Sequence, residues 1–458
     1  MNKEERIRKI GEIIKNKGAI NNKIVRWNDS PQRMDAFEID LKYLIYNKYN
    51  GRILSRTKSA EKKGISINPE TREGKELIER LLWESHKDRN KKTEQDIKDN
   101  GQKEIGVITK DGVIIDGNRR AMILSRLNIP YFNAVVLPIT LEENQKEIEK
   151  LETVFQMGED SKLDYKPIEK YLKAENLNKK GFSNEDISEF MQESVKEVEK
   201  YLDTMKIMNE YLQHFEYDGL FTRLDKREDQ FLHLTKWLNS FYGESSSKAF
   251  GGYKDSDVDD LKDIAFEYIR VDYHGKDFRL LADGHSDKHF FGDESIWSSF
   301  RDAHYDKIDS LRDDDNFRLD YSNQNLDADL DARDENQKVL EFLTENLDIH
   351  KEIVNNKKYK NEPLKLINDA KYKINAIENN KNVYSEEPLQ SLYELNNKVN
   401  RLLNQHSPDY LLNLINQQIS SIESKNCSIK KSECLASLKN IQQSAYQLEK
   451  DIKKLKSS

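Results

Sequence analysis

Cysteine is almost absent from this chain of 458 residues, because only Cys427 and Cys434 occur, both in a lysine-rich stretch near the C-terminus. Two such cysteines suit neither a disulfide scaffold nor a thiolate metal site, and they indicate a reducing compartment. No apolar run approaches the roughly 18 residues of a membrane span. The N-terminus also lacks the apolar core of a signal peptide. We therefore expect a cytoplasmic protein without a membrane partner.

An excess of positive charge is also missing. The chain has 75 basic and 83 acidic residues, and its formal net charge is −8. Proteins that coat DNA without sequence specificity usually carry a basic footprint, which this composition does not show overall. The charged content of 34% against a hydrophobic content of 36% favours helices with many exposed Lys and Glu side chains. The length predicts two to four domains.

The most informative segment is residues 113–120, Val-Ile-Ile-Asp-Gly-Asn-Arg-Arg. The apolar residues predict a short strand, and a helix is expected to open after the Asp-Gly turn. Glycine lets the backbone come close to a ligand, the first N–H groups of a helix form an anion site, and guanidinium groups suit phosphate. The alternative to a phosphate site is a strand, a turn and a helix that bind no ligand and carry two surface arginines. The candidate phosphate ligands are Gly117, Asn118, Arg119 and Arg120.

The neighbours of this loop form an ordered series. A helix over 93–102, capped by Thr93 and ended by Asn-Gly, precedes a hairpin of strands at 105–108 and 113–115. The helix after the loop is followed by Ile-Pro and a strand over 129–137. This order, with Asp-Gly-Asn-Arg-Arg between the second strand and its helix, resembles the N-terminal domain of the ParB/sulfiredoxin superfamily.

The resemblance implies that the loop cradles the phosphates of a nucleotide. Asn118 stands where ParB proteins often have Glu and where sulfiredoxins have their reactive Cys, so sulfiredoxin chemistry is excluded. The implied cofactor is a nucleoside triphosphate, CTP or ATP, which can be bound with or without Mg²⁺.

Two segments compete for a further part of the family site, an Asn-Pro-x-x-x-Arg segment that helps line the nucleotide pocket. Residues 47–52 resemble it without the proline, and residues 67–72 resemble it superficially. We prefer the first, because it follows a strand-like run over 36–46. The binding residues that this choice implies are Asn47, Asn50 and Arg52.

The second phosphate motif of ParB proteins, Glu-Asn-x-x-Arg, is not intact in this chain. The nearest carboxylate is Glu152, the nearest amide is Gln156 and the nearest cation is Lys162. If the pocket is catalytic, Asp116 or Glu152 would orient a nucleophile or Mg²⁺ while the arginines hold developing charge. Acid and imidazole residues at 273–289 also make a metal centre conceivable, but a polar loop is the favoured interpretation, and no protein metal site is predicted.

The segment 183–208 predicts two helices joined by a short turn. Ser183 is expected to cap the first helix, with Asp186 three residues on, and the second is expected over 195–208. Such a pair has helix-turn-helix geometry, which would place the second helix in a major groove. Between residues 164 and 210, however, acidic residues outnumber lysines. A structural helical domain is therefore favoured over a DNA reader, and both interpretations stay open.

The fold class that these patterns predict is α+β, with a ParB/sulfiredoxin-like domain, a helix-turn-helix-like domain and a mainly α-helical C-terminal half. The helices expected after residue 331 favour a bundle or coiled coil that binds a protein partner or a second copy. The predicted division is an N-terminal helix and extension at 1–35, the nucleotide-binding domain at 36–140, a helical domain at 141–215, a mixed, mainly helical domain at 216–330, and the bundle at 331–458.

Three hypotheses follow for the function. The first is a nucleotide-binding switch that engages DNA or a partner, as a component of a prokaryotic DNA-transaction or anti-phage defence system. The second is an enzyme that uses the same pocket, either a DNA nuclease or an NTP-hydrolysing or phosphotransfer enzyme. The third is a scaffold with a vestigial pocket.

Overall fold

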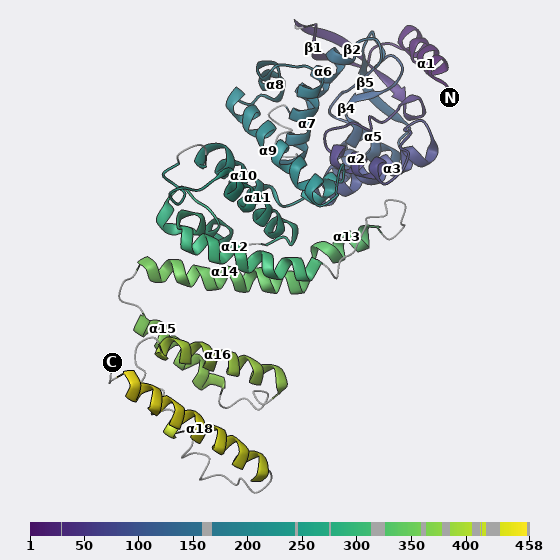
Figure 1. Ribbon diagram of the computed structural model, residues 1–458. Helices are drawn as coiled ribbons and strands as arrows, with labels where there is room; N and C mark the ends of the chain where they lie inside the picture. The colour runs from purple at the N-terminus through teal and green to yellow at the C-terminus, as the bar shows by residue number, and fades with distance from the viewer. Residues whose placement is uncertain are drawn as a thin grey trace. The chain divides into compact units, whose positions relative to one another are not determined.

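The computed structural model describes residues 1–28, 30–157, 167–242, 246–273, 276–312, 326–358, 363–377, 385–404, 413, 415–417 and 431–455. The chain divides into two compact units, residues 1–360 and 361–458. The first unit begins with a mixed five-stranded sheet and its helices and continues as a largely helical region (Figure 1). The α+β class predicted from the sequence is confirmed.

The sheet has the strand order β1-β2-β5-β3-β4. Its pairs are antiparallel except β3 and β5, which run parallel. The predicted hairpin before the Asp-Gly turn is present as β3 and β4, while the boundary expected between residues 35 and 36 falls inside β2. The strands are β1 (Asn21–Trp27), β2 (Ser30–Asp40), β3 (Gly106–Ile108), β4 (Ile114–Asp116) and β5 (Tyr131–Val136).

Both faces of the sheet are apolar, and successive side chains alternate between them as the pleat requires. Ile108 and Ala134 belong to the core beneath the N-terminal helices, whereas their neighbours Val107 and Val135 belong to the core that α6 covers. A sheet buried on both faces holds its edges and turns in fixed positions. The helices of this part are α1 (Lys3–Asn16), η1 (Leu41–Tyr43), α2 (Leu54–Lys62), α3 (Arg72–Ser85), α4 (Lys87–Asn100), α5 (Asn118–Arg126) and α6 (Gln145–Met157).

The start of α4 differs from the prediction. Thr93 was expected to cap this helix, but α4 begins six residues earlier, at Lys87. The charged residues before Thr93 are good helix formers, so the helix extends backwards and places Thr93 in its interior. The Thr93 hydroxyl donates to the carbonyl oxygen of Arg89 at 3.0 Å. Gly101, at φ 72°, ends α4, as the Asn-Gly signal predicted.

The helical region follows as α7 (Pro167–Lys179), α8 (Asn184–Met191) and α9 (Val195–His214). The predicted cap of α8 is confirmed, because Ser183 and Asp186 form a reciprocal capping box. The helix α9 runs six residues past its predicted end. The elements that complete the first unit are η3 (Phe221–Leu224), α10 (Glu228–Lys236), η4 (Trp237–Phe241), α11 (Asp255–Arg270), η5 (Lys276–Leu280), η6 (Ser286–Lys288), η7 (Phe290–Gly292), α12 (Glu294–Arg312), α13 (Leu326–Asp334) and α14 (Gln337–Lys358).

A buried carboxyl joins α7 to α2. Glu169 accepts hydrogen bonds from the Ser55 hydroxyl at 2.5 Å and the Ser55 backbone N–H at 3.1 Å, and Arg56 lies 3.6 Å away. Burial raises the pKa of Glu169 to about 7, although Ser55 and Arg56 oppose that rise. The helical region is therefore fastened to the sheet domain by a group that titrates near neutrality.

This joint makes the stability of the fold dependent on pH. The pKa of Glu169 is raised on folding from 4.5 to about 7, so its contribution is complete below pH 4.5 and is lost as the pH rises through 7. We expect Glu169→Gln to flatten the pH dependence of the free energy of unfolding between pH 5 and 8, measured by urea titration. The exposed Glu185→Gln variant is the matched control. An unchanged pH dependence in Glu169→Gln would refute this assignment.

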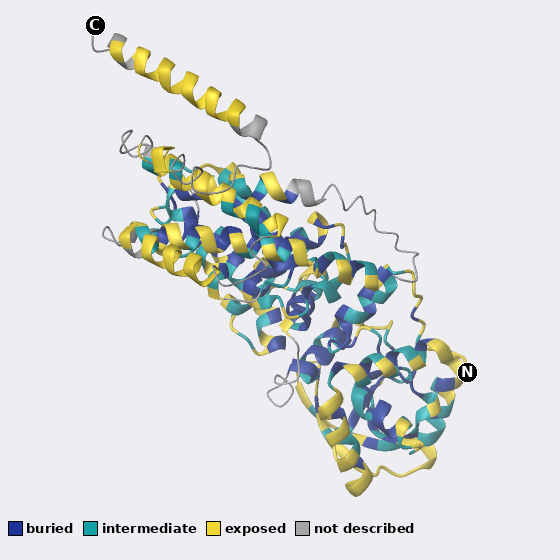
Figure 2. Ribbon diagram, turned by 90° about the horizontal axis from the view of Figure 1, so that it is seen from below, coloured by how far each residue is buried: buried dark blue, intermediate teal, exposed yellow. Residues whose placement is uncertain are grey.

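The second unit contains α15 (Pro363–Ile377), α16 (Glu386–Asn404) and α18 (Lys431–Leu455). Where the side chains of α18 are described they are exposed, as the yellow ribbon of Figure 2 shows. Several segments of the bundle expected at 331–458 lie outside the described residues. None of the helices that the structure describes combines the length and the apolar content needed to cross a lipid bilayer.

Candidate functional site

A strained turn at Gly117 opens the helix α5. Gly117 adopts φ 102° and is the N-cap residue, and no side chain caps the helix there. A Cβ atom at this position would lie 2.7 Å from Phe132 Cζ, so only glycine fits without a shift of the ring. The first N–H groups of α5, on Asn118, Arg119 and Arg120, are therefore left without a side-chain cap.

The turn gives a testable consequence for stability. In Gly117→Ala the new methyl group meets Phe132 and the residue must keep a left-handed conformation, which costs at least about 1 kcal/mol. We expect thermal unfolding to show a lowered Tm for this variant. Gly251→Ala is the control, because a Cβ atom there has nothing within 4 Å. Equal Tm values for the two variants would contradict this account of the turn.

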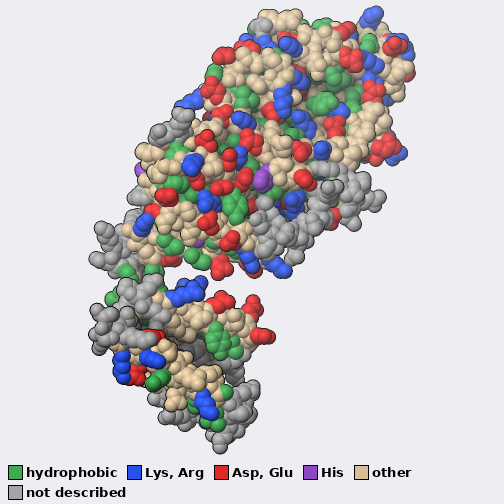
Figure 3. Space-filling model, in the orientation of Figure 1, with side chains coloured by type: hydrophobic (Ala, Val, Ile, Leu, Met, Phe, Trp, Pro, Cys, Tyr) green, Lys and Arg blue, Asp and Glu red, His purple; other side chains and the backbone are tan. Residues whose placement is uncertain are grey.

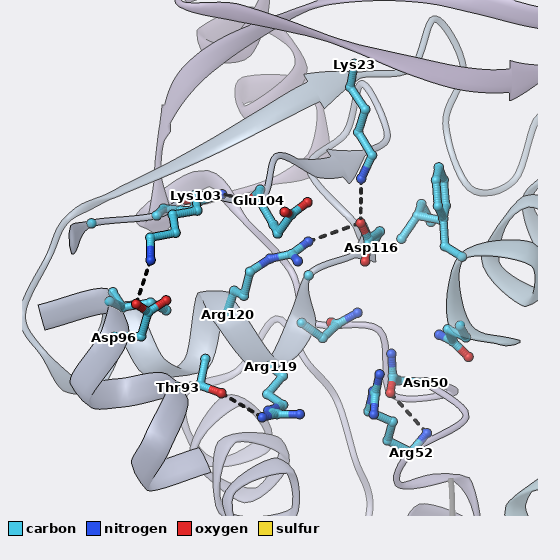
Figure 4. A pocket seen from close by; sticks show the side chains of 18 residues that line it. Lys23, Asn50, Arg52, Thr93, Asp96, Lys103, Glu104, Asp116, Arg119 and Arg120 are labelled. Atoms are coloured by element: carbon cyan, nitrogen blue, oxygen red, sulfur yellow. Dashed lines mark hydrogen bonds and ion pairs between the residues drawn. The ribbon is translucent and has the colours of Figure 1, made fainter. Parts of the chain in front are cut away.

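A cavity of about 490 Å³ lies at this end of α5 (Figure 4). Its walls come from β1, the loop before α2, helix α4 and the segment after it, the Asp-Gly turn, and the end of α6. Five basic and three acidic side chains line it among the described residues. The lining residues are Lys23, Asn50, Arg52, Thr93, Asp96, Ile97, Gly101, Gln102, Lys103, Glu104, Ile115, Asp116, Gly117, Asn118, Arg119, Arg120, Phe155 and Gln156.

Arginines crowd one wall of this cavity. Arg119 donates to the Thr93 hydroxyl at 2.8 Å, an interaction that Figure 4 shows beside Arg52 on the facing loop. Burial, together with the charges of Arg52, Arg89 and Arg120, lowers the pKa of Arg119 to about 10. A guanidinium held among three others lies in a positive potential, so an anion that enters the cavity is stabilised there.

The Asp116 carboxylate lies between two cations. Its Oδ2 atom accepts from Lys23 Nζ at 2.9 Å and from Arg120 Nη2 at 3.1 Å. Burial alone would raise the pKa of Asp116, but Arg120 and Lys23 outweigh it and hold the pKa below its usual value. The group stays ionised and is a weak base, and in this structure it orients Arg120 toward the cavity.

A chain of buried hydrogen bonds joins the Asp-Gly turn and the start of α5 to helix α6. The Asn47 N–H donates to Asn118 Oδ1 at 2.9 Å, and Asn47 Nδ2 donates to Glu152 Oε1 at 2.9 Å. Gln156 Nε2 donates to the same carboxylate oxygen at 2.6 Å, and Gln156 Oε1 accepts from the Gly51 N–H at 3.1 Å. Glu152 is buried behind Asn47 and Gln156 and does not line the cavity. Glu152 therefore holds Asn47 and Gln156 in place and has the geometry of a positioning residue.

Helix α7 supplies the cation that compensates this carboxylate. Lys173 is only 1% exposed, and its Nζ lies 3.6 Å from Glu152 and 3.4 Å from Glu149. Burial disfavours the Lys173 ammonium, but the two carboxylates outweigh burial and raise its pKa. Lys180 forms a second ion pair with Glu149. The helical region therefore supplies the counter-charges of the carboxylates that lie behind the pocket.

The structure gathers the predicted site residues at one place. Asn50, Arg52, Gln156 and the residues 116–120 line the cavity, while Asn47 and Glu152 lie directly behind it. Arg72 of the competing segment is exposed and paired with Glu76. Lys162 lies outside the described residues.

Sequence reasoning missed several residues that line the cavity, above all Lys23, Lys103 and Phe155. The Lys23 ammonium lies over the Phe155 ring at 4.8 Å and donates to the Ile105 carbonyl oxygen at 2.7 Å. Lys23 lies in β1 and Asp116 in β4, which are opposite edges of the sheet. No sequence signal shows that the curled sheet brings Lys23 to Asp116.

Comparisons of the chain with protein-family models, with curated proteins and with solved structures find no match. Any argument about function therefore rests on the residues of this chain. Within the described residues, no group of three or more His, Cys, Asp or Glu side chains is arranged to hold a metal ion.

Proposed function

We propose that this protein is a ParB-like nucleotide-binding switch, which binds a nucleoside triphosphate, CTP or ATP, in the cavity at the start of α5. The observation that carries the proposal is the crowding of Arg52, Arg119 and Arg120 around an uncapped helix start. Backbone N–H groups and guanidinium forks together are the recognised chemistry of phosphate binding.

The size and composition of the cavity agree with such a ligand. Its volume of about 490 Å³ falls within the range of small-molecule and cofactor sites. The arginines and helix N–H groups would take the phosphates, and Phe155 offers an aromatic face to a base. Two of the three carboxylates of the cavity wall, those of Asp96 and Asp116, are each paired with a lysine that lines the same wall.

The switch component of the proposal rests on the chain of buried hydrogen bonds. Asn118, which opens α5, is joined through Asn47 and Glu152 to Lys173 of α7. A ligand that moves the loops around Asn118 would therefore alter the contact with the helical region, which would in turn engage DNA or a protein partner. The setting we propose is a prokaryotic DNA-transaction or anti-phage defence system.

Surface charge argues against non-specific DNA coating as the main activity. On the face shown in Figure 3, acidic and basic side chains are interspersed over the described part of residues 1–360. The helix α9, which would be the reading helix, carries acidic residues between its lysines. If DNA is bound, we expect recognition to depend on the nucleotide state.

The test is to identify the nucleotide that copurifies with the full chain and to measure thermal shifts with CTP, ATP and ADP in Mg²⁺. The proposal predicts that at least one triphosphate raises the Tm in a saturable way. Mass spectrometry of the extracted ligand then names the base. No shift with any triphosphate would contradict the proposal.

A further inference from the structure

A second basic cavity lies in the helical region, apart from the pocket at α5. Its volume is about 510 Å³, and it is formed where the residues around the start of α10 meet η5. The residues that line it are Lys226, Asp229, Gln230, His233, Lys276, Phe278 and Arg279. Nothing in the proposed function uses this cavity.

The cations of this cavity differ from those of the other cavities. Among the described residues, Lys226, Lys276 and Arg279 form no hydrogen bond or ion pair through their side chains. In a neighbouring cavity of this region, by contrast, Lys357 is paired with Asp293. Three cations and one carboxylate, Asp229, line this cavity among the described residues, which leaves a positive potential in a chain whose net charge is −8.

The floor of the cavity is aromatic and rigid. Phe278 is 2% exposed and stacks on the buried Trp237 with ring centroids 5.1 Å apart. The His233 ring also stacks on Trp237, with ring centroids 6.3 Å apart. The Phe278 ring carries no charge, so it does not neutralise the cations Lys226, Lys276 and Arg279 that line the same cavity.

His233 reports the potential of the cavity. Burial lowers the pKa of His233, and the charges of Arg279 and Lys236 lower it further. The Asp229 carboxylate, 3.7 Å from His233 Nε2, is 87% exposed and opposes them only in part. Asp283 acts in the same direction as Asp229. Burial is the largest of these causes, and the Arg279 charge acts on the imidazole against the Asp229 carboxylate.

We infer that this cavity is a second phosphate-binding site, in which Lys226, Lys276 and Arg279 hold a phosphate group over the Phe278 floor. A lysine ammonium and a guanidinium are the side chains that bind phosphate through charge-assisted hydrogen bonds. Lys226 supports the assignment through its backbone, because it is a non-glycine residue at φ 69°, a conformation that often marks functional positions. The phosphate belongs to a free nucleotide or inorganic phosphate, or to the backbone of a nucleic acid.

The experiment is an NMR titration of the His233 ring signals in the full chain. Inorganic phosphate, ATP and a single-stranded DNA oligonucleotide are added separately. We expect at least one of them to shift these signals and to raise the pKa of His233, because a bound anion offsets Arg279. In the double variant Lys276→Ala, Arg279→Ala, we expect the affinity to fall at least about tenfold. The exposed Lys338→Ala variant, from the same region, is the control.

The outcomes separate the two sources of phosphate and the two sites. Loss of the oligonucleotide response alone identifies a nucleic-acid backbone, and loss of the phosphate and ATP responses alone identifies a small ligand. The His233 response should persist in Arg119→Ala, so that failure of the α5 pocket and failure of this site are distinguishable. If none of the three probes moves the His233 signals, or if the double variant matches Lys338→Ala, the inference is wrong.

Discussion

Replacement of Lys173 by methionine should destabilise the protein by about 3–5 kcal/mol at pH 7. Lys173 is the cation between Glu149 and Glu152, and all three side chains are buried. Methionine fills a similar volume but leaves Glu152 with hydrogen bonds from Asn47 and Gln156 and without its ion pair to Lys173. Urea unfolding of the purified full chain measures the loss. Burial already raises the pKa of Glu152, so the loss should be smaller at pH 5, where protonation of Glu152 removes the unpaired charge.

Two controls isolate the buried charge in this experiment. Lys179→Met removes an exposed lysine from the same helix, whose ion pair with Glu175 is worth no more than about 0.5 kcal/mol. The double variant Lys173→Met, Glu152→Gln removes both charges and should recover a large part of the stability. If Lys173→Met costs no more than Lys179→Met, the buried network does not hold α7 to the pocket.

Replacement of Arg119 by alanine should weaken nucleotide binding by about 10- to 100-fold, the value of one or two charge-assisted hydrogen bonds to phosphate. Arg119 lies among three other arginines, and its loss lowers the positive potential as well as removing donors. The Thr93 hydroxyl loses its donor, but it still donates to the Arg89 carbonyl oxygen. Folding should therefore be little affected. Calorimetric titration of wild type and variant with the same nucleotide measures the change.

The matched control lies on the same helix. Arg126 pairs with Glu94 at 3.2 Å and covers the Trp83 ring at 3.8 Å, and it does not line the cavity. Arg126→Ala should leave nucleotide affinity unchanged, and Arg119→Lys should retain part of it because the charge remains. Equal affinities in Arg119→Ala and Arg126→Ala would remove Arg119 from the site.

Local signals in the sequence were enough to predict much of the sheet domain. The Asp-Gly turn needs glycine for its backbone angle, and Gly117 at φ 102° opens α5 where the pattern indicated. Ser183 and Asp186 form their capping box because its donors and acceptors lie within one turn. The α+β class followed from the short apolar strands and the helical segments that the sequence predicts. These features depend on neighbours in sequence, so the sequence alone reveals them.

The remainder depends on contacts between distant segments. Lys23 reaches Asp116 across 93 positions of the chain, and Asn47 reaches Glu152 across 105. Thr93 looked like a cap, but the charged residues before it continue α4 and place its hydroxyl against Arg119. The sequence left Glu152 open as a catalytic carboxylate, because its burial and its contact with Lys173 arise only when distant segments fold together. No spacing rule along the sequence contains them.

The most direct test of the central claim is calorimetric titration of the full chain with CTP and with ATP, each with and without Mg²⁺. The account predicts saturable binding of at least one triphosphate at the α5 pocket, weakened by about 10- to 100-fold in Arg119→Ala and unchanged in Arg126→Ala. The absence of saturable binding of both nucleotides, by protein that circular dichroism shows to be folded, would contradict it.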